Sequence, residues 1–322
     1  MLRKIGLALV GIIVLIVAFP TFSLKLAQWL KPAQIKTQEA AVSMYNHETG
    51  QIIKLPMNEY LLGVVAAEMP ASFPVEALKA QAVAARTFIM QRMVPGGVAN
   101  NKHPGADVSS DPKEGQAWIS REEMKNRWGP VKFMEYYYKI KWAVDSTKGQ
   151  VITYQNQLIF PAFHASCGGG TENAEDVWAT SAPYLKGVDC PYNADPNPDR
   201  QVTFTLAELD QKLKTNLSAT PVVAGNKAVP VLVTKETGTG RPKEIKIGSK
   251  TYPATMLREI LGLRSTRITW EIKGDKITFT TRGYGHGVGL CQYGAKGMAR
   301  QGKDYKQILQ HYYTGVEIVS MD

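Results

Sequence analysis

Glu68 is the residue of this sequence whose surroundings best fit acid–base chemistry. It lies in the last turn of a predicted helix over 57–68 and is the only carboxylate in the apolar part of that helix. A carboxyl group there loses solvation and faces the negative end of the helix dipole, and both effects raise its pKa. Such a group can deliver a proton to a leaving oxygen near neutral pH, as cleavage of a glycosidic bond requires. The alternative is a structural ion pair with Lys79 or Arg86 of the following helix.

The second candidate is the cationic side of a helix predicted over 75–93. Lys79 and Arg86 are seven residues apart and therefore share a helix face. This face could bind an acidic or polar substituent of a sugar. A solvated charged face explains the same spacing equally well.

A glycine-rich segment near the end of the chain, RGYGHGVGLCQYGA (282–295), is the third candidate. No Gly-Lys-Ser/Thr follows it, so it is not a phosphate-binding loop of the Walker type. Aromatic and amide side chains on a flexible backbone are suited to stacking on sugars and binding their hydroxyl groups. We expect four of its residues to bind substrate: Tyr284, His286, Gln292 and Tyr293. A tight turn region with a purely structural role is the competing interpretation.

The segment FHASCGGGTENAEDVW (163–178) contains a histidine and a cysteine three residues apart, His164 and Cys167, and Cys190 follows later. This is a weak metal signature compared with paired CxxC motifs. A buried histidine, a free thiol and a Cys167–Cys190 disulfide remain open. We expect no metal and no cofactor, and we expect His164 and Ser166 to bind substrate instead.

The N-terminal residues predict where the protein lies relative to the membrane. A run of fifteen apolar residues over 5–19 follows Arg3 and Lys4, and it predicts a single transmembrane helix within 1–24, with 25–40 as a stalk. A cleaved signal peptide is the alternative. Either way we expect the rest of the chain outside the membrane, so intracellular nucleic acid is excluded as a partner.

The fold class expected for the rest is α+β, with a helical catalytic segment packed on a β-rich core. A hairpin is predicted over 41–46 and 50–56, and further helices and strands by changes of periodicity. These further elements are helices over 120–128, 131–146 and 304–313 and strands over 149–155 and 157–166. The main domain comprises 41–202 and 282–322, and 203–281 is a smaller inserted α+β subdomain with one helix at 206–214 and strands near 228–234, 243–247 and 266–281.

The formal net charge of the 322-residue chain is +10 and lies mostly in its second half. Residues 205–322 carry 18 Lys and Arg against 10 Asp and Glu, or +8, and residues 1–204 carry 20 against 18, or +2. A basic surface of this size favours a polyanion such as the cell wall. Three cysteines are too few for a disulfide framework, and the odd number leaves at least one unpaired.

Four motifs together resemble the family of stage II sporulation protein D, whose domain is shared with enhancers of cell-wall amidases. They are EMPASFPVEALKAQAVAART (68–87), HASCGGGTENAEDVW (164–178), APYLKGV (182–188) and GYGHGVGLCQYGAKGMA (283–299). The resemblance covers essentially the whole chain.

The resemblance implies a membrane-anchored lytic transglycosylase that cuts septal peptidoglycan during engulfment of the forespore, in the mother-cell membrane. It implies denuded glycan strands as substrate and stage II sporulation proteins P, an amidase, and M, a membrane protein, as partners. Glu68 matches the catalytic acid, Arg86 the arginine of the following helix, and Tyr184 and Lys186 a functional pair. The alternatives are a non-catalytic, murein-binding enhancer of an amidase and a metal-dependent wall hydrolase that uses His164 and Cys167.

One departure from the family concerns zinc. Some relatives bind zinc in the loop after the arginine helix through a histidine and two cysteines. The matching stretch 102–118 keeps His103 but contains no cysteine. We therefore expect no zinc in this loop.

Overall fold

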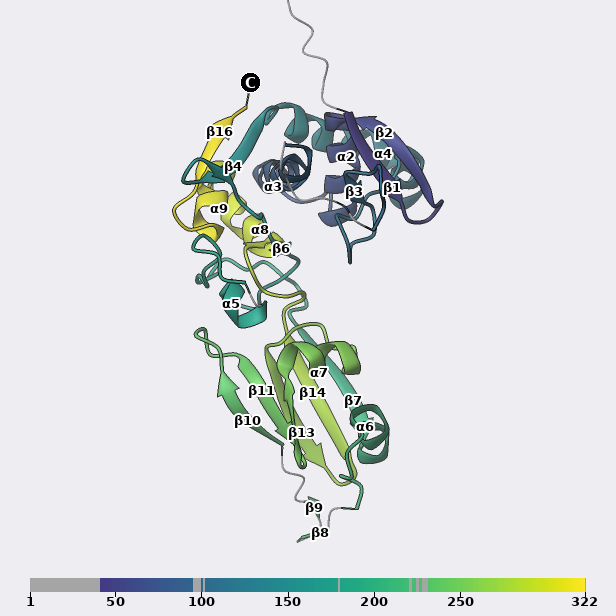
Figure 1. Cartoon of the computed structure of the whole chain (residues 1–322), viewed down its shortest axis with the longest axis vertical. Helices are drawn as coiled ribbons and strands as arrows, with labels where there is room; N and C mark the ends of the chain where they lie inside the picture. The colour runs from purple at the N-terminus through teal and green to yellow at the C-terminus, as the bar shows by residue number, and fades with distance from the viewer. Residues whose placement is uncertain are drawn as a thin grey trace, which may run out of the picture. The chain divides into compact units, whose positions relative to one another are not determined.

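The computed structural model describes residues 41–94, 100, 102–178, 180–219, 222–223, 226–227 and 231–321. The predicted anchor (1–24) and stalk (25–40) lie outside the described residues. Within the described part of the chain, no helix is long and apolar enough to cross a membrane. Residues 41–322 belong to one compact unit, whose elements are labelled in Figure 1.

The predicted N-terminal hairpin is confirmed. Strand β1 (Ala41–Asn46) pairs antiparallel with β2 (Gln51–Pro56) from Ala41 opposite Pro56 to Asn46 opposite Gln51. A short strand within the predicted loop, β3 (Val108–Ser109), adds to β1 in parallel. This pairing holds the segment after β3 close to the helices that follow the hairpin.

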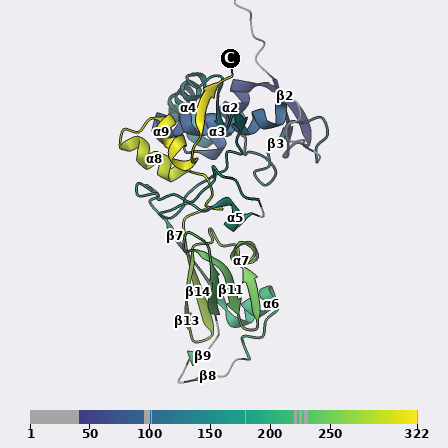
Figure 2. The same ribbon diagram turned by 60° about the vertical axis from the view of Figure 1, so that its left-hand side comes forward.

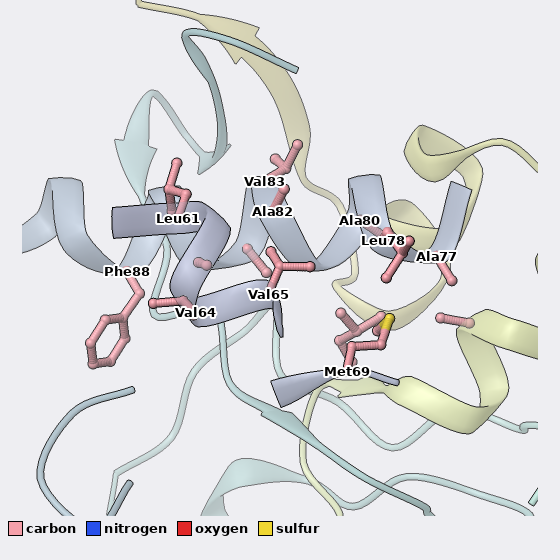
Figure 3. Packing of buried hydrophobic residues seen from close by; sticks show 14 of the residues in the cluster. Leu61, Val64, Val65, Met69, Ala77, Leu78, Ala80, Ala82, Val83 and Phe88 are labelled. Atoms are coloured by element: carbon pink, nitrogen blue, oxygen red, sulfur yellow. The ribbon is translucent and has the colours of Figure 1, made fainter. Parts of the chain in front are cut away.

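Helices α2 (Met57–Glu68) and α3 (Val75–Met93) are the two central helices and have the predicted bounds. Proline precedes each of them, where its fixed φ and missing N–H suit a helix start. Met69 ends α2 with extended backbone because Pro70 disfavours the helical region in the residue before it. Alanine-rich α3 is buried on nearly all sides, and Figure 3 shows apolar side chains of α2 and α3 together in this core.

Helix α4 (Arg121–Asp145) is two helical segments joined at a kink. Gly129 has a φ of 70° and Pro130 follows it, which explains why two helices were predicted over 120–128 and 131–146. Ser120 and Glu123 form a capping box at the first turn. The kink lets both segments pack against the central pair.

The remaining elements of the main domain are short. They are β4 (Gln150–Tyr154), β5 (Gln157–Leu158), β6 (Phe163–His164), α5 (Ala174–Val177), β15 (Leu290–Cys291), α8 (Gln292–Arg300), α9 (Tyr305–Tyr312) and β16 (Glu317–Ser320). The continuous strand predicted over 157–166 is wrong, because Pro161 cannot donate to a sheet ladder and interrupts it. Helix α8 was not predicted, since its glycines lower helix propensity.

These elements make the α+β class correct, but the expectation of a β-rich core beneath the catalytic segment is wrong. The main core is built largely from the faces of α2, α3, α4, α8 and α9. The strands around it belong to small sheets of two or three strands. The site therefore lies on a helical core with strands at its margin.

The segment predicted as an insertion has its own apolar core. Its elements are β7 (Asp199–Thr205), α6 (Leu206–Leu213), β8 (Val222–Val223), β9 (Asn226–Lys227), β10 (Val231–Glu236), β11 (Pro242–Ile247), β12 (Lys250–Pro253), α7 (Ala254–Leu261), β13 (Ile268–Lys273) and β14 (Lys276–Arg282). Strand β14 pairs with both β13 and β7, so the segment starts and ends side by side. Figure 2 shows these strands with α6 and α7 from a second direction. The division into domains stays a prediction.

Candidate functional site

Glu68 ends helix α2 half-buried, with its carboxyl group fixed by one backbone amide. The N–H of Ala117 donates to Glu68 Oε1 at 2.8 Å. Burial raises the pKa of Glu68 to about 7, and the Ala117 hydrogen bond only partly opposes this. At neutral pH the carboxyl group is therefore close to half protonated, as predicted from its place on the helix.

Glu68 also acts on Tyr60, which lies two turns earlier on α2. Burial raises the pKa of the Tyr60 phenol, the negative charge of Glu68 adds to this rise, and the positive charge of Arg92 opposes it. Tyr60 Oη donates to Gln116 Oε1 at 3.0 Å. Among the described residues, no second carboxylate shifts the pKa of Glu68. Asp107 is a second carboxylate whose charge acts on Tyr60, and Glu68 is the one whose pKa burial raises to about 7.

The loop 115–119 carries the amide that holds Glu68, and α2 fixes this loop by backbone contact. Ile119 N–H donates to the Gly63 carbonyl at 3.3 Å. A Cβ at Gly63 would lie 2.1 Å from Trp118 Nε1, so the indole occupies the space that a side chain would need. Gly63 therefore allows the approach that brings Ala117 to Glu68.

The alternative of a structural ion pair for Glu68 is wrong, because both basic candidates have other partners. Lys79 pairs with Glu76 at 2.8 Å. Arg86 is 3% exposed and donates to the carbonyls of Val144, Thr147 and Gln150, where α4 leads into β4.

These contacts also correct two expectations about substrate binding. Lys79 and Arg86 do not form a cationic face towards Glu68. Arg86 is too deeply buried for a glycan strand to reach, and its contacts tie α3 to the end of α4. We assign it a positioning role.

Tyr184, predicted from the APYLKG motif, lines a pocket of about 510 Å³. The pocket walls include Phe160, Trp178, Ala182 and Leu185, and polar Thr180 and Ser181. Tyr184 Oη accepts a hydrogen bond from the Phe160 backbone N–H at 3.0 Å, which fixes the phenol. An aromatic wall with a few hydroxyl groups is suited to stacking on a sugar ring.

A series of ring contacts connects this pocket with the helix beyond Glu68. The rings of Phe160 and Phe88 of α3 lie 6.3 Å apart. Arg92, whose charge acts on Tyr60, lies over the Phe88 ring at 3.6 Å. Arg92, Phe88 and Phe160 therefore connect α3 with the pocket, and the charges of Arg92 and Glu68 both act on Tyr60.

Lys186 lies on the surface near the pocket and pairs with Glu175 at 2.6 Å, with about two fifths of each side chain exposed. Exposed pairs of this kind are weak. The ammonium group can exchange this partner for an anionic ligand.

The glycine-rich segment separates into exposed and structural positions. Tyr284 is 51% exposed and Arg264 lies over its ring at 5.1 Å, so it is available to a ligand. Tyr293 is half-buried and packs on Phe73 with ring centroids 5.2 Å apart. Gln292 is buried and donates to Gln81 Oε1 at 3.2 Å. The prediction that Gln292 binds substrate is therefore wrong, because its amide joins α8 to α3.

His286 and Ser166, also predicted to bind substrate, make internal hydrogen bonds instead. His286 Nδ1 accepts from the Val288 N–H at 3.1 Å, so Nε2 carries the proton and donates to the Phe163 carbonyl at 2.9 Å. Burial lowers the pKa of His286 to about 3. Ser166 is buried, and its hydroxyl accepts from Asn193 Nδ2 at 3.2 Å. Both residues stabilise the loops behind the pocket.

His164, the remaining predicted ligand of the sugar, is also buried and lies in a cluster with Cys167 and Cys291. Strands β6 and β15 pair in parallel with His164 opposite Cys291. This partner was not predicted, because Cys291 is 127 residues away from His164 in the chain. The pocket residues Phe160 and Trp178 were not predicted either, and their aromatic side chains were the available signal.

The fold and the site define an α+β protein with a desolvated carboxylic acid at a helix end and an aromatic pocket. The family model described as "SpoIID: Stage II sporulation protein" matches residues 45–154, from β1 to β4. Over 304 residues the chain is 39% identical to stage II sporulation protein D of Bacillus subtilis (strain 168), covering 92% of this chain and 86% of that protein. The chain belongs to the stage II sporulation protein D family, as the motifs indicated.

Two further relatives support this assignment. Stage II sporulation protein D of Bacillus amyloliquefaciens is 38% identical over 289 residues, which cover 89% of this chain and 81% of that protein. The amidase enhancer of Bacillus subtilis (strain 168) is 29% identical over 313 residues, which cover 81% of this chain and 40% of that protein. The chain is thus similar both to stage II sporulation proteins D and to a protein named amidase enhancer.

Proposed function

We propose that this protein is a lytic transglycosylase of denuded peptidoglycan strands. It cleaves the bond between N-acetylmuramic acid and N-acetylglucosamine and leaves 1,6-anhydromuramic ends. The observation that carries this proposal is Glu68, a single carboxyl group with a pKa of about 7 and a fixed orientation.

Glu68 performs both proton transfers of this reaction. The protonated acid donates to the glycosidic oxygen as the bond to C1 of the muramoyl residue breaks. The resulting carboxylate then accepts the proton of the C6 hydroxyl as that oxygen bonds to C1. The proton returns to Glu68, and the two products contain all atoms of the substrate.

The absence of a paired carboxylate in the described site supports this reaction over hydrolysis. An inverting hydrolase needs a second carboxylate to activate water, and a retaining hydrolase needs one as nucleophile. In an intramolecular attack the substrate supplies the nucleophile. The Ala117 amide binds Oε1 of the carboxyl group, so Oε2 can face the glycosidic oxygen.

The pocket and its rim supply the substrate contacts. Tyr184 and Trp178 offer aromatic faces for a sugar ring. Denuded glycan bears lactyl carboxylates, and Lys186 is the exposed cation beside the pocket that can pair with one. Tyr284 and Tyr293 extend the aromatic surface further along the molecule.

The cellular setting follows from the family. We place the protein in the mother-cell membrane at the sporulation septum, held by the helix within 1–24, with residues 41–322 outside. Stage II sporulation proteins P and M are the proposed partners, the first as the amidase that strips stem peptides from the glycan. Septal wall remodelling during engulfment of the forespore is the proposed process.

A second candidate function is a murein-binding enhancer without catalysis, because the chain resembles a protein named amidase enhancer. The pocket would then hold glycan while a partner amidase acts. This function requires no group with a pKa near neutrality, and Glu68 therefore favours the first candidate.

The product of the reaction separates these candidates. The full chain in detergent is incubated with glycan strands that an amidase has stripped of peptides, and the products are analysed by mass spectrometry. We expect 1,6-anhydromuramic ends. Reducing ends would indicate a hydrolase, and intact strands in the presence of glycan binding would indicate the enhancer.

A further inference from the structure

Three side chains with metal-binding atoms, His164, Cys167 and Cys291, meet in the interior, and Cys190 lies next to them with its Sγ 3.1 Å from Tyr312 Oη. A ring nitrogen of His164 and the Sγ atoms of Cys167 and Cys291 all lie within 4.8 Å of one another, and all three residues are buried. The thiol of Cys190 interacts with both Cys167 and Cys291. None of the three cysteines forms a disulfide.

The fold brings these residues together from three separate parts of the chain. His164 lies on β6 and Cys167 in the loop that follows this strand. Cys190 lies further along the chain, after α5. Cys291 reaches the cluster because β15 pairs with β6 in the register that sets Cys291 opposite His164. The cluster therefore joins the long loop to the glycine-rich segment.

His164 is oriented like a metal ligand. Its Nδ1 lies 3.1 Å from the Val288 carbonyl, and since a carbonyl only accepts, Nδ1 carries the proton. Nε2 then has a lone pair, and it is buried with no hydrogen-bond partner among the described residues. Metal-binding histidines show this arrangement, with one nitrogen donating to a carbonyl and the other left for the ion. A buried imidazole nitrogen without a partner is otherwise costly.

The sulfur atoms of Cys167 and Cys291 accept hydrogen bonds, and Cys291 Sγ also donates to the Ala165 carbonyl at 3.8 Å, as a protonated thiol does. The N–H groups of Cys167 and Gly294 each donate to Cys291 Sγ at 3.3 Å. Cys291 is the N-cap of helix α8, where the helix dipole favours negative charge. Asn193 Nδ2 donates to Cys167 Sγ at 3.4 Å.

The surroundings also carry positive charge. Arg241 from the inserted segment is buried beside the cluster and donates through Nη2 to the Cys167 carbonyl at 3.0 Å. Arg241 Nε lies 3.5 Å from Glu172 Oε1, so the two opposite charges are buried together.

We propose that His164, Cys167, Cys190 and Cys291 bind one zinc ion. Three thiolates and one imidazole form a donor set typical of structural zinc sites. Four protein ligands leave no position open for water, so the site is structural and does not support the metal-dependent hydrolase considered above. The ion holds the loop segments that contain Cys167 and Cys190 against the start of α8. Helix α8 in turn packs on α3 through the hydrogen bond between Gln292 and Gln81.

This proposal reverses the expectation from the sequence that His164 and Cys167 bind no metal, and it leaves the expectation of no zinc in the loop at His103 unchanged. His103 Nε2 lies 2.9 Å from Glu114 Oε2, and its ring stacks on Tyr45. The zinc site also does not depend on the proposed glycan cleavage, since it shares no residue with the Glu68 site.

The main competing state is a disulfide between two of the cysteines, which an oxidising exterior would favour. The full chain, purified in detergent without chelator, is analysed by elemental mass spectrometry and by counting alkylated thiols. We expect about one zinc per chain, and all three thiols reactive only after denaturation with a chelator. A zinc-free chain overturns the proposal, whether its thiols are free or two of them form a disulfide.

Variants locate the ion. His164→Asn and Cys291→Ser should reduce the zinc content to less than about one fifth per chain, and His103→Gln and Ser166→Ala should leave it unchanged. Zinc retained in the first pair, or lost in His103→Gln, contradicts the assignment. If the first pair fails to fold, cobalt substitution of the wild type decides, because thiolate ligation gives charge-transfer bands in the near ultraviolet and their absence contradicts the site.

Discussion

At Glu68 the requirements of fold stability and of the proposed chemistry differ. A helix end that buries a carboxyl group favours its neutral form. The ordinary pKa is 4.5 and the folded-state value is about 7. The folded protein therefore gains stability from the neutral acid below about pH 4.5, and this gain is lost as the pH rises through about 7.

Replacing Glu68 by the neutral isostere should remove this pH dependence. We expect Glu68→Gln to match the wild type in stability at about pH 5 and to exceed it by up to about 3 kcal/mol at about pH 8. Chemical denaturation at both pH values measures the difference. The control is Glu59→Gln, an exposed carboxylate of the same helix, which should change stability little at either pH. Equal effects of the two variants would contradict the desolvated state of Glu68.

Much of the residue-scale assignment could be predicted from the sequence. The raised pKa of Glu68 was predictable because its place in the last turn of an apolar helix favours burial, while its catalytic role stays a prediction. Arg86, Gln292 and Ser166 were placed in the site although they are buried, since motif resemblance does not distinguish a side chain that touches a ligand from one that supports the fold. Cys291 was missed as a partner of His164 because strand pairing, and no local pattern, brings them together.

At the scale of elements, the contact between α2 and the loop 115–119 controls the acid. Gly63→Ala would place a methyl group against the Trp118 indole and push the loop, with its Ala117 amide, away from Glu68. We expect a loss of about 1–3 kcal/mol in stability and a lower rate of anhydro-end formation.

A double variant tests whether this clash is the cause. Adding Trp118→Ala to Gly63→Ala removes the indole that the methyl group meets, so the two changes should be non-additive in stability. Both single variants and the double variant are measured by denaturation. Additive effects would show that Gly63 does not act through Trp118.

The junction of α3, α4 and β4 depends on Arg86. Arg86→Lys keeps the charge but cannot reach the carbonyls of Val144, Thr147 and Gln150 together. We expect about 2–4 kcal/mol lower stability and an unchanged KM for glycan in the folded fraction. Thermal unfolding and glycan kinetics are compared. A raised KM with normal stability would restore the substrate-binding role that the structure argues against.

The elements themselves were predictable where local rules act alone. Prolines fixed the starts of α2 and α3, and Gly129 with Pro130 marked the division of α4. The two short strands β6 and β15 were not predictable, because each is two residues long and exists only through its partner. Helix α8 was not predicted for a related reason, because its glycines are there for tertiary packing. A Cβ at Gly297 would clash with the Tyr192 carbonyl oxygen, so this position needs glycine for close packing and not for local flexibility.

At the scale of the whole molecule, the uneven charge predicts how the protein binds the proposed glycan substrate. Residues 205–322 carry 18 basic against 10 acidic side chains. Exposed charges act over about one Debye length, which shortens with salt. We expect binding to denuded glycan to weaken at least about tenfold between about 0.05 M and about 0.5 M NaCl.

Co-sedimentation with insoluble glycan measures this binding. Glycan with amidated lactyl carboxylates is the matched control and should bind weakly at all salt concentrations. Binding that is independent of salt would show that the aromatic pocket alone carries the affinity. The excess positive charge of residues 205–322 would then not contribute to glycan binding.

The central claim is that one carboxyl group performs the cleavage. The most direct measurement is the yield of 1,6-anhydromuramic ends from denuded glycan for the wild type, Glu68→Gln and Glu59→Gln, with glycan binding measured in parallel. We predict that Glu68→Gln binds glycan but loses anhydro ends by a factor of at least about 100, while Glu59→Gln retains wild-type yield. Anhydro ends formed by Glu68→Gln at the wild-type rate would contradict this account.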